Sequence, residues 1–217
     1  MTELVGRVLA DRRLLVLAAL LVTVDVVVLG LSAARIFVEP PSDWWWRLEP
    51  WRIEVNGGPD QTWRGVQALG AGAILAVVAI TRRASWAWPF ALVFGHLGLV
   101  ILTRLHTSIA EGLVDSTGAL SKNAWAFLWM AAITGSLLAA GLRMARWSRT
   151  TIEMTAITLA LLATAVILDD VGTAFDQRRV RLSVIHLEGL VEFAFLTLAF
   201  VYAASLLRPV APVTPSA

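Results

Sequence analysis

Residues 14–37 read LLVLAALLVTVDVVVLGLSAARIF, an apolar run with Asp25 near its middle and Arg35 close to its end. A helix needs roughly 20 apolar residues to cross a hydrocarbon core about 30 Å thick. The apolar core of a signal peptide is shorter, at roughly 7 to 15 residues. The length of this run therefore predicts an uncleaved transmembrane span.

The rest of the chain continues this pattern. Its 217 residues are 58% hydrophobic and 16% charged, which is outside the range of ordinary soluble domains. Further apolar runs cover residues 66–80, 86–105, 124–142, 152–171 and 183–207. The sequence thus predicts an all-α, polytopic bundle of six transmembrane helices, forming one domain over residues 1–208. The last residues, 209–217, contain three prolines and are predicted to be a disordered tail.

Between the first two runs, residues 38–64 contain four prolines, a Gly57-Gly58 pair, five acids and five tryptophans, so we predict an external loop. Tryptophan rings settle at the level of the lipid headgroups, which suggests that this loop lies on the bilayer. The tryptophans are Trp44, Trp45, Trp46, Trp51 and Trp63.

Arginine placement predicts the orientation of the chain. Arg82-Arg83 and the segment 143–149 occupy short hairpins that contain no acid, and such hairpins favour the cytoplasmic side. Both termini are then cytoplasmic, in a bacterial inner membrane. Because the basic residues are scattered beside apolar runs, the lipid bilayer is the expected partner, and nucleic acid is not. A membrane-protein partner or a homo-oligomer remains open.

Small residues recur along several runs. Ala131, Gly135 and Ala139 are four residues apart, a spacing that gives a helix a smooth face for close packing. Gly70, Gly72, Gly95 and Gly98 have the same potential use. The alternative is that glycine and alanine are simply abundant in this chain.

Ionisable residues within spans are costly, so each is expected to be paired, to face a cavity or to act in function. Asp25 lies in the middle of the first span and His96 in the middle of the third. The other acids and histidines concentrate near the outer surface. The predicted cluster is Asp169, Asp170, His186, Glu188 and Glu192, with His106 and Glu111 as additional candidates.

Three functions fit this cluster. We favour a structural arginine–carboxylate cap in a structural protein or an accessory subunit, and no enzyme signature is present in the sequence. A proton- or ion-coupled transporter of small solutes is one alternative. It would need a cavity that reaches the middle of the membrane near Asp25 or His96.

A metal-dependent intramembrane hydrolase is the other alternative. It would need a divalent metal whose ligands lie within about 2 to 2.6 Å of a shared point. The candidate ligands are Asp169, Asp170, His186, Glu188 and Glu192. The chain has no cysteine, so thiolate ligands are excluded. Alkaline ceramidase-like hydrolases use three histidines, but His96, His106 and His186 lack the spacing of that family.

Three short motifs carry a resemblance to a group of uncharacterised six-span bacterial membrane proteins. The segment WRIEVNGGPDQ at 51–61 is similar to the stretch that follows the first span in that group. Leu168-Asp169-Asp170 resembles its fifth-span motif, and residues 188–192, EGLVE, resemble its sixth-span motif. His106 and Glu111 depart from the group, which tends to have adjacent His and Glu. The resemblance implies the six-span architecture and no activity.

Overall fold

The computed structural model describes residues 9–37, 58–103, 105–117, 122–173 and 178–207. Within these ranges the regular structure is entirely α-helical, which confirms the predicted all-α fold. The helices are α2 (Arg12–Phe37), α4 (Pro59–Thr81), α5 (Ala87–Thr103), α6 (Leu105–Thr117), α7 (Lys122–Met144), α8 (Arg149–Thr173) and α9 (Arg178–Leu206).

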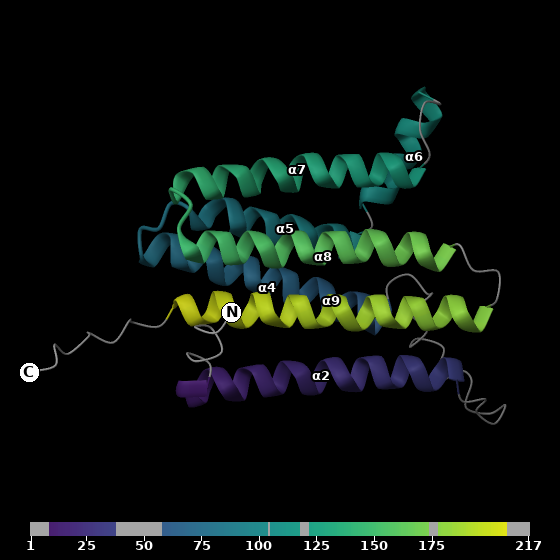
Figure 1. Ribbon diagram of the computed structural model, residues 1–217, viewed down its shortest axis with the longest axis horizontal. Coiled ribbons are helices and arrows are strands. Elements are labelled where there is room, and N and C mark those ends of the chain that lie inside the picture. The colour runs from purple at the N-terminus through teal and green to yellow at the C-terminus, as the bar shows by residue number, and fades with distance from the viewer. Residues whose placement is uncertain (1–8, 38–57, 104, 118–121, 174–177, 208–217) are drawn as a thin grey trace, which may run out of the picture.

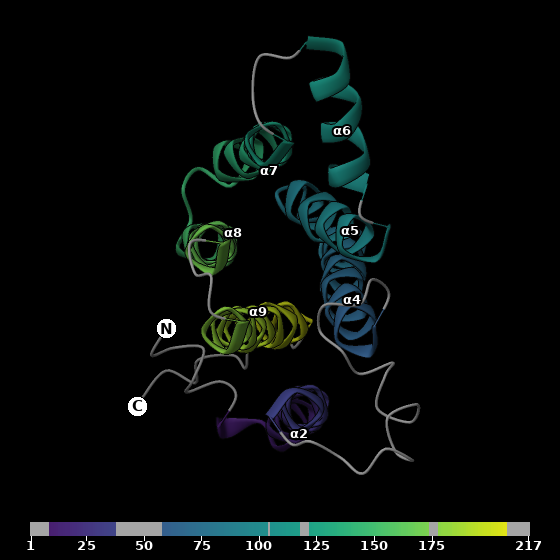
Figure 2. The ribbon, with the colours of Figure 1, turned by 90° about the vertical axis from the view of Figure 1, so that its right-hand side faces the viewer.

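The long helices run side by side, and α6 crosses the end of the bundle (Figure 1). Seen from that end, α7, α8 and α9 form one row, and α5 and α4 form a second row (Figure 2). Helix α2 packs against α9 and, less extensively, against α4. Three segments distant in sequence, α2, α4 and α9, thus meet along one side of the bundle.

A long helix covers most of each predicted apolar run, but the third run extends beyond the end of α5 to the first residue of α6, and the second was placed wrongly at its start. We assigned residues 59–64 to the external loop, whereas they form the first turns of α4. Gly58 is the extended N-cap residue and accepts a hydrogen bond from the Thr62 amide at 3.0 Å. Pro59 occupies the start of the helix, where its missing N–H costs nothing. The remainder of the predicted loop, 38–57, and the tail 209–217 lie outside the described residues.

Helix α6 was not expected from the sequence. The predicted third apolar run ends at Leu105, and the next predicted run begins at residue 124. Residues Leu105–Thr117 form a separate helix that lies across the bundle axis (Figure 2).

In the part of the chain that the structure describes, three helical segments are long and apolar enough to cross a membrane: Arg12–Ala34, Pro59–Thr81 and His186–Leu206. Two shorter apolar segments, Ala87–Thr103 and Leu128–Met144, accompany them. The outer surface of the bundle is rich in large apolar side chains. Leu20, Val26 and Ile80, for example, are 60%, 62% and 65% exposed. Soluble monomers rarely expose so much apolar surface.

The core lies between the two rows of helices and is filled by large side chains from α4, α5, α8 and α9. Phe90 and Phe94 of α5, Leu75 of α4, Met154 of α8 and Leu196 of α9 are all buried there. Close packing of this kind fixes the position of α4 against α9. The polar residues near the start of α4 are therefore held in a defined place.

Glycine allows α4 and α5 to approach closely. A Cβ atom at Gly72 would lie 2.9 Å from the Ala91 carbonyl oxygen and 2.9 Å from the Gly95 amide nitrogen. A Cβ atom at Gly98 would lie 2.9 Å from the Leu69 amide nitrogen. The small residues of α7, Ala131, Gly135 and Ala139, do not provide such an approach within the described residues. Gly135 is exposed, and a Cβ atom there would meet nothing within 4 Å.

Candidate functional site

The carboxylate of Asp25, halfway along α2, is the centre of a buried hydrogen-bond network. The Trp63 indole and the Gln67 amide, both on α4, donate to its Oδ1 atom at 2.7 and 2.8 Å. The Thr197 hydroxyl, on α9, donates to its Oδ2 atom at 2.7 Å. The Gln67 amide also donates to the Thr197 hydroxyl oxygen at 2.9 Å. Three neutral donors from two helices thus solvate one carboxylate.

These contacts follow from the residue pattern at the start of α4. Asp60, Trp63, Arg64 and Gln67 are spaced i, i+3, i+4 and i+7, which places them on one side of a helix. The same side continues with apolar residues such as Leu75. The inward face of α4 is therefore polar in its first two turns and apolar after them.

Arg64 forms the second part of the network. Its guanidinium group pairs with Asp60, one turn earlier, at 3.0 Å, and with Glu192 of α9. Phe193, the neighbour of Glu192, places its ring centroid 6.0 Å from the guanidinium carbon. The arginine is thus held by two acids and one aromatic ring, and it links α4 to α9.

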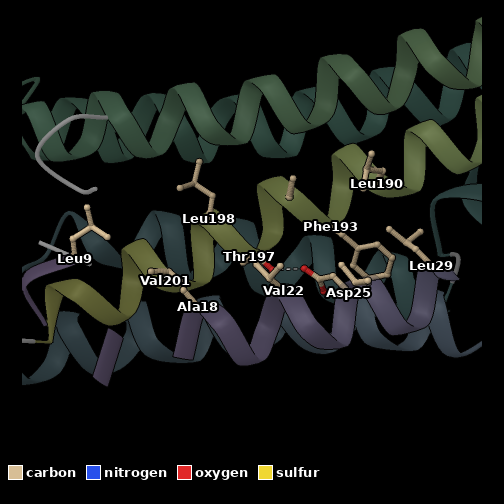
Figure 3. Close-up of a pocket in the computed structure, with 12 residues that line it drawn as sticks. Leu9, Ala18, Val22, Asp25, Leu29, Leu190, Phe193, Thr197, Leu198 and Val201 are labelled. Atoms are coloured by element: carbon tan, nitrogen blue, oxygen red, sulfur yellow. Dashed lines mark hydrogen bonds between the residues drawn. The ribbon is translucent and has the colours of Figure 1, made fainter. Parts of the chain in front are cut away.

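An apolar pocket of about 400 Å³ lies between α2 and α9, beside Asp25 (Figure 3). Asp25 is the charged residue and Thr197 the polar residue among its described lining. The rest of that lining is apolar, from both helices, and includes Val22, Val26 and Leu190. We call this space the α2–α9 pocket. Its size is within the range of about 300–1,000 Å³ that is usual for small-molecule sites.

The charges of the network do not balance. Among its described members, Asp25, Asp60 and Glu192 are acids and Arg64 is the cation. Asp25 makes its hydrogen bonds to neutral groups, and Arg64 is already shared by the other two acids. A buried carboxylate with no cationic partner is costly in an apolar environment. Asp25 is thus the member of the network most suited to take up a proton or another cation.

Of the predicted outer cluster, Glu192 is part of this network. Glu188, one turn earlier on α9, lies close enough to Arg64 to interact with it electrostatically. His186 precedes both on the same helix and is partly buried. The side chains of Asp169 and Asp170 lie outside the described residues, so the predicted cluster as a whole stays a prediction.

The additional candidates lie apart from one another. Asp25 is the centre of the network described above. His96 packs edge-to-face on Trp129 of α7, with ring centroids 5.0 Å apart, and lies on α5. Glu111 is exposed on α6. The side chain of His106 lies outside the described residues.

A metal site is not assembled in the part of the chain that the structure describes. Within those residues, no three His, Asp or Glu side chains lie in a group that could hold a metal ion. The proposed ligand set includes Asp169 and Asp170, so the metal prediction is untested.

Sequence reasoning selected Asp25 but missed the residues that surround it. Asp60, Trp63 and Arg64 were assigned to the external loop, and neither Gln67 nor Thr197 was singled out. The i, i+3, i+4, i+7 spacing on α4 was the available signal, because polar residues with that spacing define one helix face. Thr197 gave no comparable signal, since a single threonine is common in an apolar helix.

Comparisons with known protein families, curated proteins and solved structures find no match for this chain. The function is therefore argued from the site alone.

Proposed function

We propose that the chain is a six-span membrane carrier that binds a small solute at Asp25 and couples its binding to a proton. The observation that carries this proposal is the carboxylate of Asp25, buried halfway along an apolar helix and lining the α2–α9 pocket. A transporter requires such a cavity near the middle of the membrane.

The surface and the ends of the bundle support a membrane location. Large apolar side chains face outward, while Asp25, Gln67 and Thr197 are buried, which is the distribution expected when the surroundings are lipid. Exposed arginines gather at one end, where α2 begins, α9 ends and two hairpins turn (Figure 1). These arginines are Arg12, Arg13, Arg82, Arg83, Arg143, Arg146 and Arg149.

This distribution supports the orientation that we propose, with the arginine-rich end and both termini on the cytoplasmic side of a bacterial inner membrane and α6 on the outer side. The chain has no cysteine, so single cysteines can report it. We expect Ser108→Cys on α6 to react with a membrane-impermeant maleimide in spheroplasts. Ser85→Cys, in the turn between α4 and α5, should react only after the membrane is opened. Reaction of both in sealed spheroplasts would contradict a span through α5.

The network assigns different roles to its acids. Asp60 and Glu192 neutralise Arg64, and the Glu192 pair connects α4 to α9, which is the structural role that we favoured for the outer cluster. Asp25 forms no such ion pair with the described residues, and it lines the pocket. Proton uptake and solute binding therefore belong to Asp25, and the Arg64 pairs hold the helices around it.

The carrier proposal is tested in proteoliposomes that contain a pH-sensitive dye. The solutes are a primary alkylammonium ion, a neutral polyol and a carboxylate, each added outside, and liposomes without the chain are the blank. We expect one class to produce a proton flux that falls about tenfold or more in Asp25→Asn, since that substitution removes the titrating group but keeps its shape. A flux that is equal in Asp25→Asn, or absent for all three classes, would contradict a proton-coupled carrier.

A further inference from the structure

We propose that the α2–α9 pocket binds an amphipathic organic cation, with its ammonium group at Asp25 and its hydrocarbon tail along the apolar lining. This inference rests on the proposed role of Asp25 as the binding residue, and it names the chemical class of the solute.

Charge is the first argument. The hydrogen-bond partners of Asp25 among the described residues are an indole, an amide and a hydroxyl, all of which are neutral. The nearest cation of the network, Arg64, is engaged by Asp60 and Glu192. Phe193 contacts Arg64 with its ring and also lines the pocket. A ligand in the pocket therefore meets one negative charge and no positive charge among the described lining, so a cation is favoured and an anion is repelled.

Hydrogen-bonding capacity is the second argument. A carboxylate has about four acceptor positions, and the contacts of Asp25 occupy three. Among the described residues, Oδ2 accepts from the Thr197 hydroxyl alone, so it can take one further donor. A primary ammonium group, which has three donors and no acceptor, can donate to the position that is left open on Oδ2.

The lining of the pocket is the third argument. Val22, Val26 and Leu190 line it and are 49%, 62% and 53% exposed, so its rim is continuous with the outer apolar surface of the bundle. A hydrocarbon chain can enter there from the lipid without crossing a polar barrier. If an ammonium group is joined to such a chain, the ammonium group can lie at Asp25 while the hydrocarbon chain lies against the apolar side chains of the pocket. A small hydrophilic cation would leave the apolar lining unused.

The test uses decylammonium as the probe and decyl sulfate as its charge-reversed counterpart. An alkyl ammonium group stays protonated at pH 7, as lysine does. Binding is measured by calorimetry on the full chain in phosphatidylcholine nanodiscs, with empty nanodiscs as the blank. We expect saturable binding of decylammonium to the chain and only lipid partitioning for decyl sulfate.

Three variants localise the binding. Asp25→Asn removes the charge, and Val22→Trp fills the pocket without altering the charge; each should weaken decylammonium binding about tenfold or more, the loss expected for a charge-assisted contact. Val27→Trp is the matched control, because Val27 is also on α2, is 52% exposed and does not line the pocket. Its affinity should equal that of the original chain. If Asp25→Asn does not fold, the two tryptophan variants still decide.

Equal binding of decylammonium and decyl sulfate, or equal affinities for Val22→Trp and Val27→Trp, would overturn the inference. Its failure is distinguishable from failure of the carrier. Saturable decylammonium binding without any proton flux would retain the cation site and reject transport. Flux driven by the polyol or the carboxylate, with no decylammonium binding, would retain the carrier and reject this solute class.

Discussion

Replacing Arg64 with leucine is expected to lower the free energy of unfolding by about 3–5 kcal/mol, because it leaves Asp60 and Glu192 without their cation. Both acids are largely buried, with side chains 3% and 15% exposed. The loss would be measured as a shift in the unfolding midpoint of the purified chain, titrated with sodium dodecyl sulfate in mixed micelles.

Arg149 provides the matched control. It pairs with Glu153 at the same i, i+4 spacing and at 3.1 Å, but its side chain is 62% exposed. Exposed pairs contribute about 0–1 kcal/mol, so Arg149→Leu should shift the midpoint only slightly. Equal shifts for the two variants would show that the buried Arg64 pairs contribute no more to the free energy of unfolding than the exposed Arg149 pair.

A double variant shows whether the loss of stability in Arg64→Leu comes from the unpaired acids or from the lost contacts of the arginine side chain. In Arg64→Leu/Glu192→Leu, the acid on α9 is removed together with its cation. Replacing a buried ion pair with apolar side chains is often neutral or stabilising, so this variant should recover most of the loss. Asp60 remains, but it lies in the first turn of α4, where the helix dipole favours an acid. A double variant as unstable as Arg64→Leu would contradict the ion-pair explanation.

The all-α fold could be predicted because its signal is local. Each apolar run is long enough to indicate a helix by itself, and a long helix covers most of each of the six runs. The start of α4 could not be placed in the same way. Its first turns contain Pro59, Asp60 and Trp63, residue types that are typical of loops, and their helical role depends on partners in α2 and α9.

The site was only partly predictable for the same reason. Asp25 stands out in the sequence, since a charge inside an apolar run demands an explanation. Its partners are 38, 42 and 172 positions away along the chain. No spacing within one helix predicts that Thr197 faces Asp25, because that contact depends on how α2 packs on α9. The pocket likewise forms where α2 and α9 pack together, so the sequence of one helix alone does not predict it.

The second large effect concerns the α4–α5 contact. We expect Gly72→Ala to destabilise the chain by about 1–3 kcal/mol, the usual cost of overpacking. The new methyl group would lie 2.9 Å from two backbone atoms of α5, and backbone cannot turn aside as a flexible side chain does. This cost should exceed the gain of about 1 kcal/mol that alanine brings to a helix.

Gly95→Ala gives the control on the facing helix, and it should change stability in the opposite direction. A Cβ atom at Gly95 would meet nothing within 4 Å, so the substitution should retain the helix-propensity gain of up to about 1 kcal/mol. The two midpoints, measured by the same detergent titration, should therefore lie on opposite sides of the original. If Gly72→Ala also stabilised the chain, α4 and α5 could not be in backbone contact at Gly72. The position of Trp63 and Gln67 relative to Asp25 would then have to be reconsidered. Both residues are on α4, and the packing of α4 on α5 helps to fix where α4 lies.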